Sequence, residues 1–199
     1  MKYPEQHKQE VSQRLRQQAA RLLREKGVDG ISVKSVMASE GMTVGGFYAH
    51  FDSKQALLVE AIKSAFKDSE QRFYPLLDNA PAKDWIPNLL RLYLSEMHRD
   101  NVEHACPISS LMGDIARSDP KIRRVFQEGM EYMLDLYTRR VSELGDDEAR
   151  QVAMGLVSLM AGGIQLSRAV ADEKYSAEIL QSCIASAEVM LRNYQSAPS

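Results

Sequence analysis

The chain has little of what secreted or membrane-spanning proteins need. Its 199 residues include two cysteines, Cys106 and Cys183, which are too few for a disulfide framework. No apolar run approaches the roughly 20 residues that span a bilayer, and the opening MKYPEQHKQEVSQ lacks the apolar centre of a signal peptide. We therefore expect a cytoplasmic protein with reduced cysteines and no membrane partner.

Signatures of common catalytic chemistry are missing as well. The sequence contains no nucleophile elbow, no glycine-rich phosphate loop and no HExxH zinc motif. His98, His104 and Cys106 lie close together in the chain, but their spacing matches no zinc pattern, and a polar loop with incidental histidines explains them better. We expect no enzyme activity, no cofactor and no metal.

Strand-like alternation of apolar and polar residues never extends beyond a few positions. Apolar residues instead recur at helical spacing, and glycine, proline or capping residues separate the segments. The sequence therefore predicts an all-α fold of about nine helices. The expected helices cover residues 5–26, 32–40, 43–51, 53–73, 84–97, 107–115, 120–144, 147–171 and 176–194.

Charge is distributed unevenly along the chain. Residues 1–54 hold nine Lys or Arg against six Asp or Glu, a net charge of +3. The remainder holds sixteen against twenty-one, a net charge of −5. A basic N-terminal part on an acidic body is typical of a DNA-binding head attached to a regulatory domain, although chance unevenness is an alternative.

The stretch from residue 32 to residue 57 organises the chain. Ser32 can cap one short helix, Gly41 can take the positive φ of a tight turn, and Thr43 can cap a second helix. Phe47 and Phe51 of this second helix point back toward the first. Two short helices joined by a glycine turn predict a helix-turn-helix, whose second helix enters a DNA major groove. A core helix hairpin is the alternative.

One run within this stretch has a specific pattern, in which aromatic-Tyr-x-His-Phe is followed by Ser-Lys. Its residues are Gly41, Met42, Thr43, Val44, Gly45, Gly46, Phe47, Tyr48, Ala49, His50, Phe51, Ser53, Lys54 and Leu57. The run resembles the signature of the TetR/AcrR family of bacterial transcriptional repressors, and the close match covers roughly residues 8–60. The family pattern often has Ala, Ser or Thr where Gly46 stands, and this departure lowers the local helix propensity. The resemblance implies a helix-turn-helix domain at residues 1–52 and a helical regulatory, ligand-binding and dimerisation domain at residues 53–199.

The resemblance also implies which residues contact operator DNA. By their positions in the family pattern, Tyr48, His50 and Lys54 contact the phosphate backbone, and their side chains can all donate to phosphate oxygens. Five further residues occupy positions near the base edges: Lys34, Thr43, Val44, Gly45 and Gly46. Since none of the five is Arg, Asn or Gln, the usual bidentate base contacts are missing, and DNA shape contributes much of the specificity.

The middle of the chain predicts a cavity for a small-molecule inducer, because aromatic residues and methionines share the apolar faces of three helices. Methionine fills irregular spaces and accepts varied ligand shapes. An ordinary core is the alternative. The candidate ligand-binding residues are Trp85, Tyr93, Met97, Cys106, Met112, Phe126, Met130, Met133 and Tyr137.

Residues 147–171 are apolar around nearly the whole helix, so this helix must be buried on more than one side. Together with residues 176–194 it is expected to form a two-fold, four-helix dimer contact. The expected interface residues of the homodimer are Leu156, Leu159, Gly163, Ile184, Ala187 and Leu191.

We expect the protein to be a repressor that a small-molecule inducer releases from its operator. One alternative is an oxidant or electrophile sensor acting through Cys106, because a helix N-terminus after this residue can lower the thiol pKa. Cys183 lies on an apolar stripe and is expected to be inert. The sequence also allows a small-molecule-binding protein or enzyme with a vestigial helix-turn-helix, or a purely structural DNA-binding protein.

Overall fold

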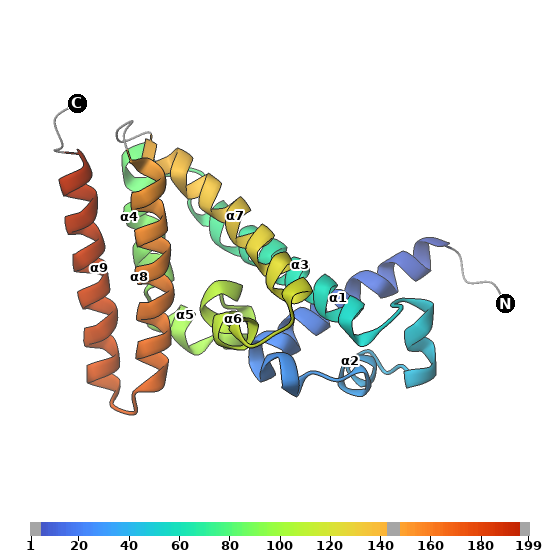
Figure 1. Ribbon diagram of the computed structural model, residues 1–199. Coiled ribbons are helices and arrows are strands. Elements are labelled where there is room, and N and C mark those ends of the chain that lie inside the picture. The colour runs from blue at the N-terminus through green and yellow to red at the C-terminus, as the bar shows by residue number, and fades with distance from the viewer. Residues whose placement is uncertain (1–4, 143–147, 196–199) are drawn as a thin grey trace.

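The computed structural model describes residues 5–142 and 148–195, and within these ranges the chain forms nine α-helices, three short 3-10 helices and no strand (Figure 1). The predicted all-α fold is therefore confirmed. In chain order the elements are α1 (Glu5–Gly30), α2 (Val33–Ser39), η1 (Val44–Ala49), α3 (Lys54–Phe73), η2 (Tyr74–Leu76), α4 (Ala82–Tyr93), α5 (Glu96–Asp100), η3 (Val102–His104), α6 (Pro107–Ala116), α7 (Pro120–Ser142), α8 (Ala149–Ala169) and α9 (Glu173–Gln195).

The molecule is elongated. The antiparallel pair α8 and α9 forms one end, and α1, α2 and η1 form the other (Figure 1). Helices α3 and α7 run side by side between the two ends, and α3 also packs along α1. Helix α3 therefore links α1 at one end to α7, which in turn packs against α8 at the other end.

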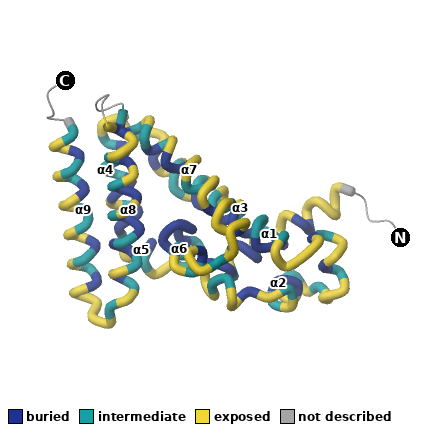
Figure 2. The backbone as a smooth tube through the Cα atoms, viewed as in Figure 1, coloured by how far each residue is buried: buried dark blue, intermediate teal, exposed yellow. Residues whose placement is uncertain are grey.

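Helix α1 buries one apolar stripe against α3, as the periodicity predicts. Val11, Leu15, Ala19 and Leu23 are buried, whereas the opposite face of the helix is exposed (Figure 2). The sequence predicts that the helix ends at Gly27. The regular helix is interrupted there, with φ of 72°, and a second, short helical segment follows to Gly30.

One buried cation ties α1 to the rest of the molecule. The Arg24 side chain is 1% exposed and donates to the Ala65 carbonyl at 2.7 Å and to the Asp68 carboxylate at 2.9 Å, both on α3. Its other terminal nitrogen donates to the Glu103 carbonyl of η3 at 3.0 Å. Burial lowers the pKa of Arg24 and Asp68 raises it, but a guanidinium stays charged in proteins. Three segments of the chain therefore meet at one charge.

Helix α8 packs against α6, α7 and α9, so the expectation of burial on several sides is confirmed. By length and composition alone, α8 is the one described helix that could cross a membrane, contrary to the expectation from the sequence. Of its most apolar window, 44% is buried inside the molecule.

The break in α1 generates the first prediction. A Cβ at Gly27 would collide with the Asp114 carboxylate of α6, which accepts a hydrogen bond from the Val28 amide at 3.1 Å. Gly27→Ala must also hold a positive φ, so we expect the free energy of unfolding to fall by about 2 kcal/mol or more. Urea denaturation measures this loss.

Gly113→Ala is the matched control, because Gly113 lies beside Asp114 within α6 and an added Cβ would meet no atom within 4 Å. Alanine has a higher helix propensity than glycine, so this substitution should raise the free energy of unfolding by up to about 1 kcal/mol. Equal losses in the two variants would contradict our account of the α1 break.

Candidate functional site

The first helix of the predicted helix-turn-helix is well defined. Ser32 caps α2 by accepting a hydrogen bond from the Ser35 amide at 3.0 Å, and the Ser35 hydroxyl accepts one from the Ser32 amide at 3.0 Å. Gly41 follows the helix with φ of 67°, as the turn requires. Glu40 pairs with Arg14 at 2.9 Å and so fixes the end of α2 against α1.

The second element differs from the predicted α-helix over residues 43–51. It is the six-residue 3-10 helix η1, and the Thr43 side chain makes no capping bond. Gly45 and Gly46 explain the difference, because each lowers helix stability by about 1 kcal/mol relative to alanine, and short 3-10 helices tolerate such sequences.

Packing holds η1 in place where its hydrogen bonds are few. Phe47 is 1% exposed and stacks on Phe51 with ring centroids 5.5 Å apart, so both phenylalanines point inward as predicted. The opposite side of η1 is open, since Val44 is 48% and Tyr48 is 73% exposed. A buried aromatic anchor therefore presents an exposed valine and tyrosine on a rigid support.

The predicted DNA-contacting residues belong to α2, η1, the segments that flank η1 and the start of α3. Gly46 and His50 are half-buried, and the other six have exposed side chains or backbone. Lys54 is the first residue of α3, whose N-terminus Ser53 caps by accepting from the Ala56 amide at 3.0 Å. The positive end of the α3 dipole and the ammonium therefore coincide, which favours a phosphate at this point.

A hydrogen bond to α1 fixes the ring of His50. Its Nδ1 lies 2.7 Å from the Ser12 hydroxyl, and Ser12 is buried. Burial lowers the pKa of His50, and Lys8 and Arg16 lower it further. The neutral ring, fixed through Nδ1, leaves Nε2 as the nitrogen for an outside partner. The sequence carried no signal for this serine, because it is 38 positions away.

The predicted ligand-binding residues fall in different parts of the described structure. Six of the nine are buried, and four of these line neither of the two grooves described below: Trp85, Tyr93, Cys106 and Tyr137. Trp85 and Tyr137 lie 5.9 Å apart between ring centroids, and Tyr74 of η2 packs against both. The indole Nε1 of Trp85 is buried and has no hydrogen-bond partner in the part of the chain that the structure describes.

The remaining predicted residues line outer grooves or face solvent. Met112, Phe126 and Met130 line a groove of about 370 Å³ where α6, α7 and α8 meet. Met133 lines a second groove of about 400 Å³ between α3 and α7. Met97 is 65% exposed and separate from both.

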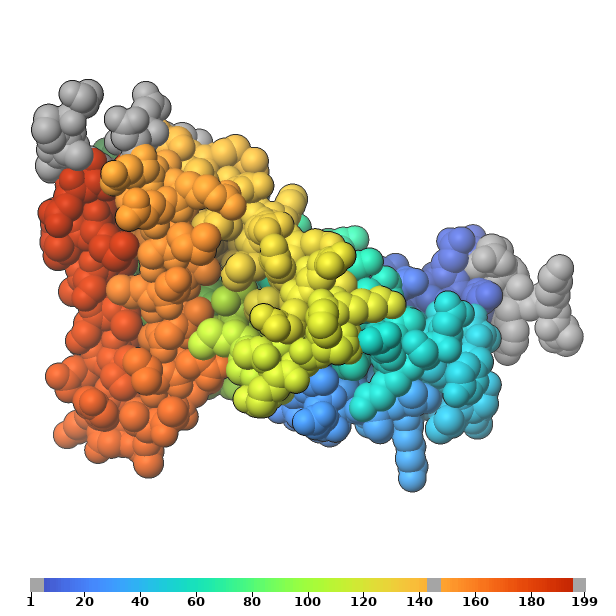
Figure 3. Space-filling model, viewed as in Figure 1, coloured from blue at the N-terminus to red at the C-terminus, as the bar shows by residue number. Residues whose placement is uncertain are grey.

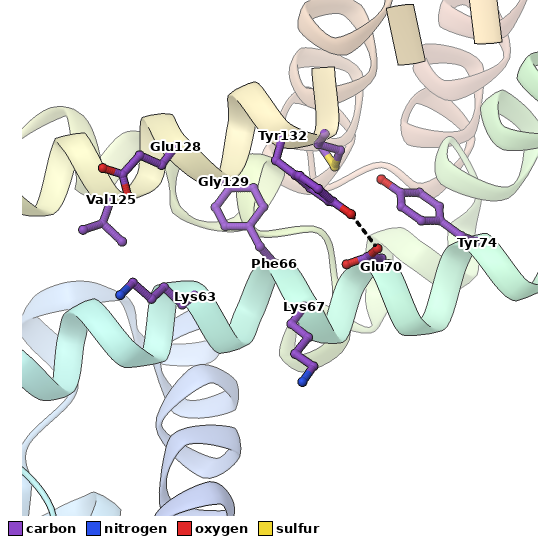
Figure 4. Close-up of a pocket in the computed structure, with 10 residues that line it drawn as sticks. Lys63, Phe66, Lys67, Glu70, Tyr74, Val125, Glu128, Gly129 and Tyr132 are labelled. Carbon is purple, nitrogen blue, oxygen red and sulfur yellow. Dashed lines mark hydrogen bonds between the residues drawn. The ribbon is translucent and has the colours of Figure 1, made fainter. Parts of the chain in front are cut away.

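The groove between α3 and α7, here called the α3–α7 groove, combines aromatic and charged side chains (Figure 4). Phe66 projects from α3 onto the backbone of α7 at Gly129, where a Cβ would collide with its ring. The sequence indicates no ligand role for α3, because its apolar face has the pattern of plain core. The ten lining residues are Lys63, Phe66, Lys67, Glu70, Tyr74, Val125, Glu128, Gly129, Tyr132 and Met133.

The expectation of a reactive Cys106 thiol is wrong in its physical premise. Cys106 is 1% exposed, and burial raises the pKa of its thiol, although a hydrogen bond from Tyr93 opposes the rise. The sequence places His98 in a polar loop, yet it is buried and its Nε2 accepts from the Cys106 amide at 3.0 Å. Its Nδ1 lies 2.6 Å from the Tyr93 carbonyl, an acceptor, so Nδ1 carries the proton and the ring is neutral.

His98 generates the second prediction. Burial lowers its pKa from 6.5 to about 4. Between these two pH values the unfolded chain therefore binds a proton on this histidine and the folded chain does not. This contribution to stability is complete above pH 6.5 and is lost as the pH falls to 4. The loss amounts to about 3 kcal/mol. Urea unfolding across this pH range measures it.

His98→Gln keeps an acceptor for the Cys106 amide but cannot bind the proton. The pH dependence of its unfolding free energy between pH 6.5 and 4 should be shallower by about one proton. Identical slopes for the variant and the unaltered protein would show that His98 does not titrate on unfolding.

The predicted dimer residues are divided between the interior and the surface. Four of them are buried within the subunit: Leu156, Gly163, Ala187 and Leu191. A Cβ added at Gly163 would lie 2.8 Å from Cys183 Sγ, so the close packing of the two helices requires glycine there. Leu159 and Ile184 are half-buried. Further apolar residues form the outer surface of the pair, which lies at one end of the molecule (Figure 3). These are Met154, Leu166, Tyr175 and Val189, with exposed fractions of 42–60%.

In residues 5–142 and 148–195, no group of three or more His, Cys, Asp or Glu side chains could hold a metal ion. His98 is engaged by backbone groups on both ring nitrogens, as described above. His104 lies 3.6 Å from Glu103, an ion pair only if the histidine is protonated, and burial lowers its pKa.

Two family models match the chain. The model described as bacterial regulatory proteins of the tetR family matches residues 15–61, which contain α2 and η1. The model described as the C-terminal domain of transcriptional regulators that are LmrA/YxaF-like matches residues 82–185. The chain therefore belongs to the TetR family and is a DNA-binding transcriptional regulator. Regulators of this family are generally not enzymes.

Solved structures of this family share the fold across nearly the whole chain. A TetR transcriptional regulator from Chloroflexus aurantiacus is 23% identical with a TM-score of 0.78, covering 94% of this chain and 96% of that one. NemR of E. coli in its reduced form is 18% identical with a TM-score of 0.77, covering 96% and 99%. A TetR-family regulator from Cytophaga hutchinsonii is 15% identical with a TM-score of 0.79, covering 96% and 98%. No curated protein matches the sequence.

Proposed function

We propose that this protein is a homodimeric, cytoplasmic repressor that a small-molecule inducer releases from operator DNA. The observation that carries the proposal is η1, whose buried Phe47 anchors an exposed Val44 and Tyr48 beside the Gly41 turn. The family membership supports DNA binding, and the grooves of the body supply places for an effector. No catalytic activity, cofactor or membrane association belongs to this function.

DNA binding and regulation are assigned to different parts of the chain. Residues 1–52 form the DNA-binding domain and residues 53–199 form the regulatory and dimerisation domain, with the boundary at the Ser53 cap of α3. Residues 43–51 enter the major groove. Tyr48, His50 and Lys54 contact phosphates, and Lys34, Thr43, Val44, Gly45 and Gly46 face the base edges.

The dimer forms through the outer face of α8 and α9. On α8, Met154, Gly162 and Leu166 recur every four or eight residues, and an added Cβ at Gly162 would meet no atom within 4 Å. A two-fold contact there brings together the same apolar residues from both copies. Leu159 and Ile184 are half-buried and lie at the edge of this face. The buried residues of the predicted interface pack beneath it within the subunit: Leu156, Gly163, Ala187 and Leu191.

Lys54→Ala provides the test of DNA docking. The variant should bind specific and nonspecific DNA more weakly, and the slope of log K against log salt should decrease by about one unit, because one phosphate contact is lost. Fluorescence anisotropy with labelled duplexes at several salt concentrations measures both quantities.

Lys83→Ala is the matched control, since Lys83 is an exposed lysine in the first turn of a body helix, α4. It should change neither affinity nor salt slope. If both variants behaved like the unaltered protein while folded, the docking geometry proposed here would be refuted.

Leu166→Arg provides the test of assembly. Leu166 is 60% exposed on α8, so an arginine is tolerated in the monomer but appears twice across a two-fold contact. We expect sedimentation to show monomers at micromolar concentration, with weaker operator binding because the two half-sites are no longer linked.

Leu76→Arg is the control for surface charge, because Leu76 is 68% exposed on η2, outside this face. It should remain dimeric. A monomeric unaltered protein, or dissociation of both variants alike, would rule out the α8–α9 interface.

A further inference from the structure

The α3–α7 groove has the size and the chemistry of a small-ligand site. Its volume of about 400 Å³ lies within the range of roughly 300–1,000 Å³ common for ligand pockets. Phe66, Tyr74 and Tyr132 supply aromatic walls from α3, η2 and α7, and Met133 supplies an adaptable apolar surface (Figure 4).

Glu70 is the least solvated charge in this groove. It is half-buried, and its carboxylate accepts a hydrogen bond from the Tyr132 hydroxyl at 3.1 Å. Among the described residues, no lysine or arginine forms an ion pair with it, and Figure 4 shows the Lys67 side chain directed away from α7. A carboxylate has about four acceptor sites, so Glu70 retains capacity for a further, charged donor.

We propose that the α3–α7 groove binds an organic monocation, with its apolar body against Phe66 and its charged group beside Glu70 and the aromatic faces. The site would be that of the inducer, so this inference rests on the proposed function. Aromatic faces attract cations through their quadrupoles, and a half-buried carboxylate adds a less screened charge. Lys63 and Lys67 also line the groove, but both are exposed, and Lys63 already pairs with Glu60 at 3.4 Å.

The same groove lies between α3 and α7, where Phe66 meets Gly129. The edge of the Phe66 ring touches the α7 backbone because Gly129 has no side chain. A ligand that displaces this ring separates α3 from α7. Since Arg24 and the Arg16–Glu60 pair hold α3 to α1, the separation moves the DNA-binding elements, and ligand and DNA weaken each other's binding.

Titration of the full chain with three naphthalene probes tests the proposal. Isothermal calorimetry would compare (2-naphthylmethyl)trimethylammonium with neutral 2-naphthalenemethanol and anionic 2-naphthylacetate. We expect the cation to bind roughly tenfold more tightly than the neutral probe, and the anion more weakly still. Equal or tighter binding of the neutral or anionic probe would overturn the proposal.

Glu70→Gln isolates the carboxylate, because the amide oxygen still accepts the Tyr132 hydrogen bond. Affinity for the cation should fall roughly tenfold, with the neutral probe unaffected. Glu131→Gln is the matched control, since Glu131 is an exposed carboxylate on the same helix as Tyr132 but lines the groove shared with α6 and α8. Unchanged affinity in Glu70→Gln, or equal losses in both variants, would overturn the proposal.

Measuring DNA binding on the same protein distinguishes a failure of the groove proposal from a failure of the proposed repressor function. Failure of the cation to bind a protein that binds DNA with the expected salt slope refutes the groove proposal alone. Glu70-dependent binding of the cation to a protein that binds no DNA refutes the repressor function and leaves the site. Glu70-dependent binding that lowers DNA affinity supports both.

Discussion

The arrangement of the whole molecule depends on the buried guanidinium of Arg24. A buried charge is tolerated only when acceptors replace its water, and Arg24 finds them on α3 and η3 rather than on its own helix. Losing any one acceptor leaves the charge undersolvated, so these three segments keep one relative position. Because Arg21 also pairs with Glu103 and Asp114 of α6 accepts a hydrogen bond from the Val28 amide, α1 is joined to the body by several polar contacts along its last turns.

These polar contacts limit how α1 can move relative to the rest of the molecule. The DNA-binding elements pack on α1, and α1 packs along α3 and pairs with it through Arg16 and Glu60, so we expect them to move together with the first part of α3. The contact between α3 and α7 is of another kind, since it consists of Phe66 against bare backbone with a groove alongside. Apolar contacts of this type repack at lower cost than a buried ion pair breaks.

Sequence reasoning predicted the all-helical fold, the long helices and the inward phenylalanines, because periodicity and capping are local signals. It does not predict what depends on burial in the folded chain. The sequence places His98 in a polar loop, yet the residue is buried and both ring nitrogens are engaged by the backbone of Tyr93 and Cys106. Burial of Cys106 itself raises the pKa of its thiol. An apolar helix face in the sequence does not distinguish a buried aromatic cluster from the wall of an open groove.

Helix η1 shows how a weak element can still present side chains accurately. Two glycines prevent a full α-helix, so the orientation of Val44 and Tyr48 depends on the Phe47–Phe51 stack in the core rather than on helical hydrogen bonds. Because a close-packed core resists small deformations, we expect η1 to keep this one docked geometry. Regulation in this molecule is therefore expected to move the whole DNA-binding unit on α3 and to leave η1 itself unchanged.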